Sequence, residues 1–396
     1  MKPPTDWQIH ELNEIAVIQT GLSKSASRTG GFVRLPYLRV ANVQDGHFDL
    51  SEVKEIDVPK FLVDRFRVLP GDLLLTEGGD FDKLGRGAIW SGEIKDCVHQ
   101  NHIFVVRSDR RKMDQRFLAL QTQGPHGRAY FQSCSKQSTN LASINSTQLK
   151  QFPTMVPPLP EQRKIADILG TWDEALEKLD ALIASKARRK KALMQQLFTG
   201  KRLLRSHTEW RRIQLSEVAE EQSERNEETL DRSRLFAVTK AEGMVPMRER
   251  VQGATVHRCK IVERGWFAYN PMRINIGSIA RWEGTDPVMV SGDYVVFRAN
   301  ESRLLSDYLN HLRRSTAWAD FVGASGNGSV RVRIWFDDLG RFKFLLPSLA
   351  EQRAIAHILD AADTELRLLR SQRAALDQQK RGLMQRLLTG KVRVNV

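Results

Sequence analysis

Glu161-Gln162-Arg163 recurs 190 positions later as Glu351-Gln352-Arg353, and both copies run without a gap to a closing Thr-Gly-Lys, at 199–201 and 389–391. Counted from the prolines at 157 and 347 to these lysines, the two copies match at 21 of 45 positions. A repeat of this length constrains the architecture more than any local pattern does. We expect two similar scaffolds in one chain of 396 residues, each carrying its own variable module.

The repeated segments have the pattern of long coiled-coil helices. Seam positions in the first copy are spaced alternately by four and three residues, which is the heptad period. They are Ile165, Leu169, Trp172, Leu176, Leu179, Ile183, Lys186, Lys190, Leu193 and Leu197. The second copy keeps the seam and has Lys380 at the position of Lys190. A helix over 161–198, about 38 residues, would be roughly 57 Å long.

Each predicted helix has a narrow apolar stripe, so it must pair with another surface. The nearest candidate is the other copy. Two equivalent helices related by a two-fold axis perpendicular to them would pack antiparallel. The alternative is that each helix packs on its own module as ordinary core. A lysine within the seam is expected to fix the register of the pair.

The segments between the helices are two versions of one module. Asp6-Trp7 begins the first and Glu209-Trp210 the second, and β-branched and aromatic runs that predict strands occur at matching places, such as 103–107 and 294–298. The expected fold class is α+β. Two mixed α/β modules, 1–156 and 201–346, are separated by two long antiparallel coiled-coil helices, 157–200 and 347–396, in a pseudo-two-fold, circular arrangement. Joined in space, the two chain ends would form a linker equivalent to the one between Gly200 and Trp210.

Composition favours a polyanionic partner. The chain has 61 Lys and Arg against 47 Asp and Glu, a net charge of +14, and nucleic acid is the commonest partner of such proteins. Charge alone does not separate DNA from RNA or an acidic membrane. Three distant cysteines favour neither structural zinc nor a disulfide framework. Since we find no signal peptide and no apolar run long enough to span a bilayer, we expect a cytoplasmic protein.

The loops of the two modules differ far more than their strands. They are rich in Gly and in side chains that read base edges, because Arg can fork onto guanine and Asn or Gln onto adenine. Any one of these residues could belong to an ordinary polar surface, but diverged loops on a shared frame imply two different ligands. The candidate DNA contacts are Arg39, Asn42, Asp80, Lys83, Arg86, Gln100, Asn101, His102, Lys136, Gln137, Ser138, Thr139 and Asn140 in the first module, and Lys240, Asn270, Arg273, Asn275, Asn327, Ser329, Arg331 and Arg333 in the second.

Catalytic signals are weak. Gly200-Lys201 is followed by Arg202, so no phosphate-binding P-loop is completed. Asn270-Pro271 matches the start of an adenine methyltransferase motif that the following residues do not continue. Asp72, Glu93 and Lys95 could imitate a nuclease triad, and His99 with His102 a metal pair, but each pattern is common by chance. We expect no catalytic residue, no metal and no cofactor in this chain.

The doubled Glu-Gln-Arg elements with their Leu-Phe-Thr-Gly-Lys and Leu-Leu-Thr-Gly-Lys endings, the loop Thr76–Gly87 and Asn270-Pro271-Met272-Arg273 make the chain resemble the specificity subunits of Type I restriction–modification enzymes. The resemblance covers essentially the whole length. It implies two target-recognition domains that each read one half of a split, asymmetric double-stranded DNA sequence. It also implies helices that set the spacer between the halves.

The resemblance further implies partners. Two methyltransferase subunits, which bind S-adenosylmethionine and methylate adenine N6, would dock on the helices, and ATP-driven restriction subunits would join them. The residues expected to dock the methyltransferase subunits are Glu161, Gln162, Arg163, Ile165, Glu351, Gln352, Arg353 and Ile355. Two alternatives stay open at this point: the recognition subunit of a related, fused methyltransferase–nuclease assembly, and an orphan or decoy DNA-binding protein.

Overall fold

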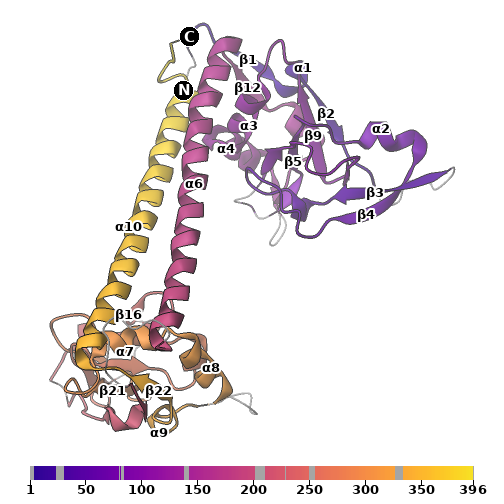
Figure 1. The fold of residues 1–396 in the computed structure, drawn as a ribbon. Coiled ribbons are helices and arrows are strands. Elements are labelled where there is room, and N and C mark those ends of the chain that lie inside the picture. Colours follow the sequence, from indigo (N-terminus) through magenta and orange to yellow (C-terminus); the bar gives the residue numbers. More distant parts are fainter. Residues whose placement is uncertain are drawn as a thin grey trace. The chain divides into compact units, whose positions relative to one another are not determined.

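The computed structural model describes residues 4–23, 31–79, 81, 84–137, 142–200, 210–227, 229–248, 255–325 and 333–395. It divides into two compact units: unit 1 comprises Met1–Leu179 and Gln372–Val396, and unit 2 comprises Asp180–Ser371. Each unit contains one mixed module and part of each long helix, α6 (Leu159–Phe198) and α10 (Leu349–Leu388) (Figure 1). The division therefore runs through both long helices, whereas the sequence places boundaries at their ends.

The module of unit 1 is built from small sheets. The main sheet is antiparallel and has the order β2-β9-β5-β7, with strands Ala16–Thr20, Ile103–Ser108, Leu73–Thr76 and Gly87–Ile89. A second sheet, β4-β3-β8, has strands Lys54–Pro59, Phe32–Leu38 and Val98–His99, and β3 and β8 run parallel. The third, β10-β11-β6, joins Lys136–Gln137, Ala142–Ser143 and Gly78–Gly79. Finally, β1 (Gln8–Glu11) pairs with β12 (Pro153–Val156), which brings the two ends of the module together at the start of α6.

Two helices in unit 1 connect the main sheet with the long helices. Asp114 caps α3 (Gln115–Gln123) by accepting hydrogen bonds from the backbone of Arg116 and Phe117, and a proline opens α4 (Pro125–Cys134). One core cluster joins Phe104 of β9 with Phe117 of α3 and with Ile165 of α6, so α3 and α4 lie between sheet and α6 (Figure 1). The shorter helical segments are α1 (Leu12–Ile15), η1 (Val40–Asn42), η2 (Lys60–Leu62), α2 (Val63–Phe66) and α5 (Ser146–Lys150).

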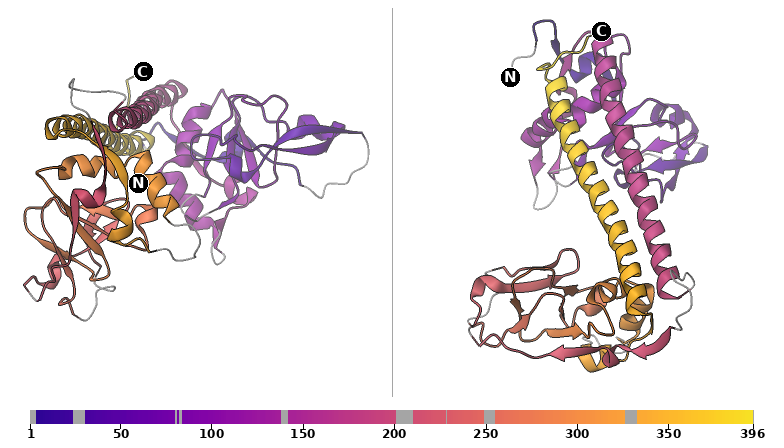
Figure 2. Two further views of the ribbon diagram at one scale, coloured as in Figure 1. Left: turned by 60° about the horizontal axis from the view of Figure 1, so that its bottom comes forward. Right: turned by 60° about the vertical axis from the view of Figure 1, so that its left-hand side comes forward.

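Within unit 1 the first part of α6 packs antiparallel against the last part of α10. Leu387 shares a core with Ile165, and the ammonium group of Lys380 pairs with the Asp173 carboxylate. After Gly390 the chain turns back on the amino terminus, because the Arg393 guanidinium lies 2.6 Å from an Asp6 oxygen and 2.7 Å from a Glu161 oxygen. Both termini accordingly lie at the same end of the helix pair (Figure 2).

The module of unit 2 repeats this topology. The sheet β14-β21-β18-β19, with strands Ala219–Gln222, Val295–Ala299, Phe267–Tyr269 and Ile279–Arg281, corresponds to the main sheet of unit 1. The sheet β16-β15-β20-β17, with strands Gly243–Pro246, Leu235–Thr239, Val288–Val290 and Lys260–Val262, again contains a parallel pair, β15 with β20. The pairing of β13 (Arg211–Gln214) with β22 (Lys343–Leu346) closes the module as β1 and β12 close the first.

Helices of unit 2 occupy the matching places. They are α7 (Ser306–Leu312), α8 (Thr316–Ala324), which is capped by the Ser315 hydroxyl, and α9 (Phe336–Leu339), with the turns η4 (Leu215–Glu217), η5 (Arg232–Arg234) and η7 (Ile274–Ile276). The core joins Phe297 of β21 and Tyr308 of α7 with Leu359 of α10 and Leu197 of α6. Each module therefore packs on both long helices.

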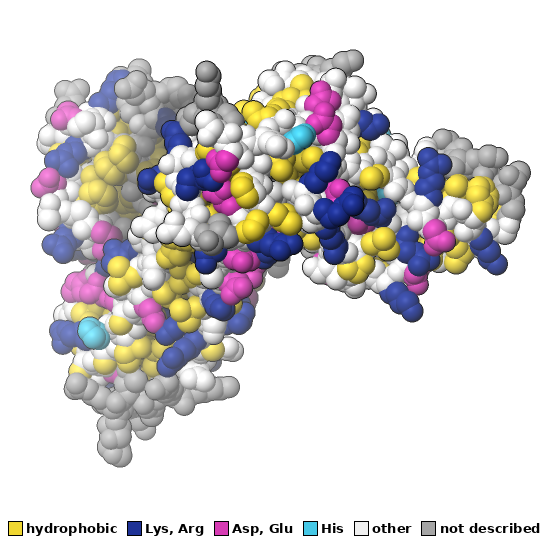
Figure 3. All heavy atoms as spheres, turned by 90° about the horizontal axis from the view of Figure 1, so that it is seen from above, with side chains coloured by type: hydrophobic (Ala, Val, Ile, Leu, Met, Phe, Trp, Pro, Cys, Tyr) yellow, Lys and Arg dark blue, Asp and Glu magenta, His cyan; other side chains and the backbone are white. Residues whose placement is uncertain are grey.

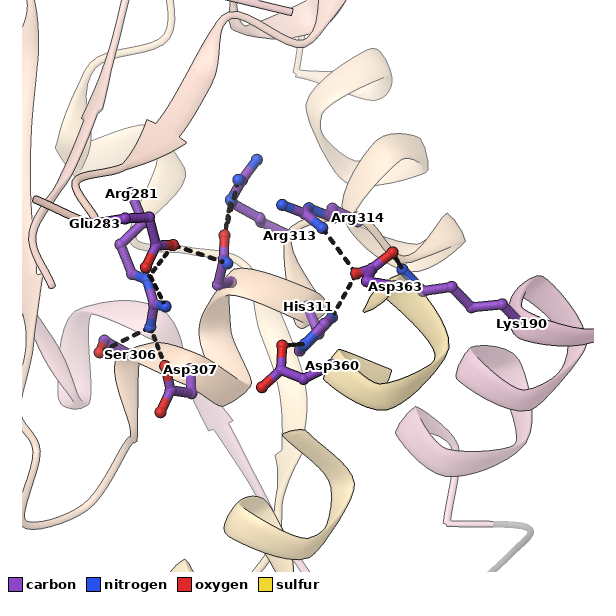
Figure 4. Close-up of polar contacts among 11 residues, drawn as sticks. Lys190, Arg281, Glu283, Ser306, Asp307, His311, Arg313, Arg314, Asp360 and Asp363 are labelled. Carbon is purple, nitrogen blue, oxygen red and sulfur yellow. Dashed lines mark hydrogen bonds and ion pairs between the residues drawn. The ribbon is translucent and has the colours of Figure 1, made fainter. Parts of the chain in front are cut away.

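Unit 2 also contains an antiparallel stretch of helix pair. Lys190 of α6 pairs with Asp363 of α10, and Lys186 pairs with Glu365. The imidazole of His311, from α7, is buried beside the same helix, with Nε2 2.8 Å from Asp360 and Nδ1 3.9 Å from Asp363 (Figure 4). Burial lowers the pKa of His311, so this side chain is neutral at pH 7.

The predicted fold class is confirmed. Every predicted seam position, from Ile165 to Leu197 and from Ile355 to Leu387, is buried or half-buried. The two seam lysines form equivalent ion pairs, because Lys190 and Lys380 lie one repeat offset apart and so do their partners, Asp363 and Asp173. The proposed alternative, packing on the helix's own module, also occurs at the helix ends, where Ile165 and Ile355 each enter a module core.

Candidate nucleic-acid interface

The loops singled out in the first module come together at one edge of it. Gly78–Gly79 pairs with Ala142–Ser143, which pairs in turn with Lys136–Gln137. The backbone N–H of Glu77 donates to the carbonyl of His102, and the N–H of Thr76 donates to the carbonyl of Arg86. Segments from four separate stretches of sequence, near 78, 86, 101 and 137, are therefore neighbours in space.

Side chains at this edge are positioned by neighbouring groups. The His102 imidazole, half exposed, pairs with the Glu77 carboxylate, and Asn101 is in hydrogen-bond range of the same ring. Arg86 is half-buried and donates to the carbonyl of Val40 at 3.3 Å. Gln100 and Asn101 are also half-buried. A ligand at this edge would therefore meet donors and acceptors that the fold already holds in place.

The second module brings its predicted residues together in a different way. The N–H of Ile334 donates to the carbonyl of Pro271 at 3.0 Å, which places the Asn270–Asn275 turn beside Arg333. Arg273, Asn275 and Arg333 are exposed, and so are the apolar side chains of Met272, Ile276 and Trp335. Lys240 comes from the β15–β16 hairpin and lies against Gly277, whose φ of +95° suits glycine. The Asn270 side chain accepts from the backbone of Met272 and shapes the turn.

Several candidates fall outside the described residues. These are Asp80, Lys83, Ser138, Thr139, Asn140, Asn327, Ser329 and Arg331, and the side chains of Lys136 and Gln137. Their assignment as DNA contacts stays a prediction from sequence.

Asn42, another predicted DNA contact, is bonded within its own module. This side chain is 2% exposed; its amide donates to the carbonyls of Asp49 and Glu52, and its oxygen accepts from the N–H of Arg39. Asn42 therefore holds a turn. Arg39 is half-buried and lies 3.5 Å from Glu52, so its charge is partly compensated within the module.

Most of the predicted docking set is also internal. Glu161, Gln162 and Ile165 are at most 2% exposed, as are Glu351, Gln352 and Ile355. Glu161 accepts from the Trp7 indole and Glu351 from the Trp210 indole, at 3.2 and 2.9 Å. The two glutamine amides bond to the backbone of their own modules. Burial leaves Arg163 and Arg353 as the members of the set whose side chains are exposed.

The residues of the weak catalytic patterns either bond within the fold or lie exposed on the surface. Asp72 is buried and accepts a forked pair of bonds from Arg107, at 2.7 and 2.8 Å, while Glu93 and Lys95 are exposed. His99 is fully buried and its Nδ1 bonds to the carbonyl of Ile103 at 3.1 Å; burial lowers its pKa to about 4. In the described part of the chain, no three His, Cys, Asp or Glu side chains are placed to share a metal ion. Nor does that part contain a helix both long and apolar enough to cross a membrane.

The basic excess is visible on the surface. Figure 3 shows Lys and Arg side chains across the face drawn there, with a dense group over the first module. Many of the cations in the described residues are paired, such as Arg128 with Asp45 and Arg298 with Glu220. This pairing leaves the net charge of +14 unchanged, but it lowers the number of cations that are free to contact a polyanion.

Comparison with known proteins agrees with this architecture. Residues 4–184 match the family model "Type I restriction modification DNA specificity domain". A putative type I restriction enzyme MjaX specificity subunit from Methanocaldococcus jannaschii is 25% identical over 410 aligned residues, which cover 99% of this chain and 95% of that protein.

Solved structures share the fold. A chain from a study of complex assembly and conformational transition of the type I R-M system superposes with a TM-score of 0.61 at 16% identity, covering 99% of this chain and 100% of that one. The HsdS subunit from Thermoanaerobacter tengcongensis gives 0.51 at 17% identity, with 99% of each chain covered. The chain is therefore similar, over essentially its whole length, to specificity subunits of Type I restriction–modification enzymes.

Sequence reasoning missed three groups of residues. Trp7 and Trp210 appeared as starting points of the modules, and their bonds to the two glutamates were not foreseen. Asp173 and Asp363 had a clear signal, because they lie 190 positions apart and match in both copies. Arg313 had no such signal, since its bond to the carbonyl of Ile279 and its place in the fold depend on a strand distant in sequence.

Proposed function

We propose that this chain is the DNA-specificity subunit of a Type I restriction–modification complex. Each module reads one half of a bipartite, asymmetric duplex target, and the long helices set the number of base pairs between the halves. The observation that supports this proposal is the combination of an identical buried frame and unrelated exposed loops. Both modules fix a tryptophan, a glutamate and a glutamine in the same contacts, but present different polar side chains at the edges described above.

Physical reasoning favours such a split reader. A small module supplies a few base contacts, each worth about 1–3 kcal/mol of discrimination. Two modules on one frame add their discrimination, and contacts to phosphates position each module without reading sequence. When the two half-sites differ in sequence, we expect similar frames to carry different loops.

The proposal extends to partners. Methyltransferase subunits, which bring S-adenosylmethionine, dock on the surface around the long helices, and restriction subunits join through them in the cytoplasm. Arg163 and Arg353 are the exposed members of the predicted docking set and hold equivalent positions. A pull-down of the methyltransferase subunit with the double variant R163A/R353A tests their part; the matched control is R188A/R189A on an exposed stretch of α6. We expect the first variant, and not the control, to weaken the complex.

Adenine methylation in cells tests the main proposal. The chain and its neighbouring methyltransferase are expressed together and separately in a host without adenine methylation, and the methylome is sequenced. A bipartite motif is expected in the joint culture. If the same motif is methylated by the methyltransferase alone, the specificity role is refuted.

Loop exchange then tests the division of labour. Residues 76–143 are replaced by the corresponding segment of a relative with another target, and residues 270–275 with 326–335 are exchanged in a second variant. Each exchange should alter one half of the methylated motif and leave the other half and the spacer unchanged. A change in both halves from either exchange would contradict independent modules.

A further inference from the structure

A cavity of about 750 Å³ lies in the module of unit 2. Its walls come from the β15–β16 hairpin, the turn η7, strand β19, the residues that follow α7, and helix α8. They include Lys240, Asn275, Arg281, Arg313 and Trp318. The volume falls in the range of about 300–1,000 Å³ typical of small-ligand sites. The cavity could therefore hold a phosphate group together with the sugar attached to it.

Cations outnumber anions in its lining. The lining cations are Lys240, Arg281, Arg313 and Arg314, and the lining anions are Glu242 and Glu283. Arg281 is already compensated, because its guanidinium pairs with Glu283 at 2.8 Å and with Asp307 (Figure 4). Arg314 lies 3.3 Å from Asp363. The carboxylates near the cavity are thus largely committed to these two arginines.

Arg313 is held differently. Its Nε and Nη2 donate to the side-chain oxygen of Asn310, at 3.0 and 2.8 Å. Its Nη1 donates to the carbonyl of Ile279 at 2.9 Å. Figure 4 shows where Arg313 lies among its neighbours. All these acceptors are neutral, and within the described ranges Arg313 forms no ion pair. A guanidinium has five N–H donors, so these bonds leave two of them for a ligand.

Burial makes an anion at Arg313 favourable. Desolvation lowers the pKa of Arg313 to about 9, which still leaves the side chain charged at neutral pH. A partly desolvated cation without a counter-charge is unfavourable, and an anion that enters the cavity would compensate it through short, charge-assisted hydrogen bonds. The side-chain amide of Asn310 in turn lies 3.5 Å from Glu283. The neighbours therefore orient the Arg313 guanidinium without neutralising its charge.

The mouth of the cavity carries residues already singled out as DNA contacts. Lys240 and Asn275 are exposed and line it from two different loops. A smaller cavity, of about 380 Å³, occupies the matching place in the first module, where Arg86, Thr122, Gln123 and Arg128 line it. The equivalent glutamines Gln162 and Gln352 accept from the backbone of Asp114 and Leu305, so position 114 of the first module corresponds to position 305 of the second. The same offset matches position 122 with 313 and position 128 with 319. In both modules, a hollow thus opens beside the predicted reading loops.

We propose that the cavity of unit 2 is a phosphate-binding site, in which the Arg313 fork and the Lys240 ammonium hold the phosphate group and Asn275 bonds to an attached sugar or oxygen. The inference rests on the proposed function for its main source of phosphate, the backbone of the bound DNA. A free nucleotide or inorganic phosphate has the same recognising chemistry and is the other source.

Salt dependence of DNA binding distinguishes the sources. Full-length wild-type chain and the variants R313A, R313K and K240A are titrated with a labelled duplex of mixed sequence, because phosphate contacts do not depend on sequence. Loss of one phosphate contact should lower the slope of log K against log salt by about 0.9, which corresponds to roughly eightfold weaker binding at 0.1 M salt. R341A is the matched control, since Arg341 is exposed in the same unit and does not line the cavity.

Phosphorus NMR provides the second arm. Inorganic phosphate should show a broadened ³¹P line with wild-type chain and a sharper one with R313A. A lower salt slope in R313A and K240A, but not in R341A, identifies DNA as the source. An unchanged slope with wild-type broadening identifies free phosphate instead.

An unchanged slope and no broadening would overturn the inference. If R313A melts differently by circular dichroism, the exposed K240A variant carries the test. If wild-type chain fails to bind any duplex, the proposed function fails, and the ³¹P arm still decides whether the cavity takes phosphate.

Discussion

In unit 1 the Trp7 indole donates to Glu161, and in unit 2 the Trp210 indole donates to Glu351. The reading edges beside these matched contacts are built differently. The first module uses a three-stranded ribbon, β10-β11-β6, where the second uses the turn η7 and the segment around Arg333. The difference shows which groups the fold constrains. A buried polar side chain needs partners in one geometry, whereas an exposed loop is free to change as its ligand changes.

The buried glutamines test the shared frame with the largest expected effect. Gln162 accepts from the N–H of Asp114 and donates to the carbonyls of Lys112 and Pro157; Gln352 does the same with Leu305, Arg303 and Pro347. Q162A and Q352A should each lower the free energy of unfolding by about 4 kcal/mol, because each leaves three buried or part-buried backbone groups unpaired. Urea unfolding followed by circular dichroism measures the loss.

The exposed neighbours provide the controls for that comparison. R163A and R353A should change stability by less than about 0.5 kcal/mol. A large effect of Q162A with a small effect of Q352A would show that the two halves of the frame are not equivalent.

His99 should make the first module the more acid-sensitive of the two. It lies in β8, opposite Leu38, where the second module has Val290 opposite Phe236 in the matching strand pair. The folded-state pKa of His99 is about 4, below the unfolded value of about 6.5. The unfolded chain therefore takes up the proton first, and the stability present above pH 6.5 is lost as pH falls toward 4.

Replacing His99 by valine tests its contribution to acid sensitivity. Between pH 7 and pH 5, H99V should lose about 2 kcal/mol less unfolding free energy than wild type, as measured by urea unfolding at both pH values. H257V, at an exposed position of unit 2, is the control and should behave as wild type. Equal acid sensitivity of H99V and wild type would show that His99 does not titrate on unfolding.

The seam ion pairs should give the smallest effects. Double-mutant cycles on Lys190 with Asp363 and on Lys380 with Asp173 should each give a coupling of about 1 kcal/mol, because these pairs are partly shielded from solvent. The single variants should differ, since Asp363 also pairs with Arg314. We expect D363A to cost more than D173A, and equal costs would show that the extra contact adds nothing.

Much of the shared frame could be predicted, because the sequence contains two copies of it. The offset of 190 and the alternating spacing of the seam led to two long helices with an antiparallel pairing, and both are present. The strand runs at 103–107 and 294–298 likewise lie in matching strands, β9 and β21. Repetition separates a structural pattern from chance.

The roles of individual polar residues were harder to predict. The doubled Glu-Gln-Arg motif resembles a surface signature, and its glutamate and glutamine prove to be buried because backbone groups from distant turns surround them. The side-chain amide of Asn42 has the groups that could bond to adenine. In the fold it donates instead to backbone carbonyls seven and ten residues further along the chain. Whether a side chain faces a ligand or its own backbone depends on tertiary neighbours, which spacing along the chain does not reveal.

Arg393 makes the segment that follows α10 part of the fold of unit 1. Its guanidinium neutralises the buried Glu161 and pairs with Asp6, while Val392 and Val394 pack on the core of unit 1. A nonsense mutation at codon 393 would remove Arg393 and leave the Glu161 carboxylate without its counter-ion. A frameshift in this short stretch should therefore damage the protein more than its distance from either reading edge suggests.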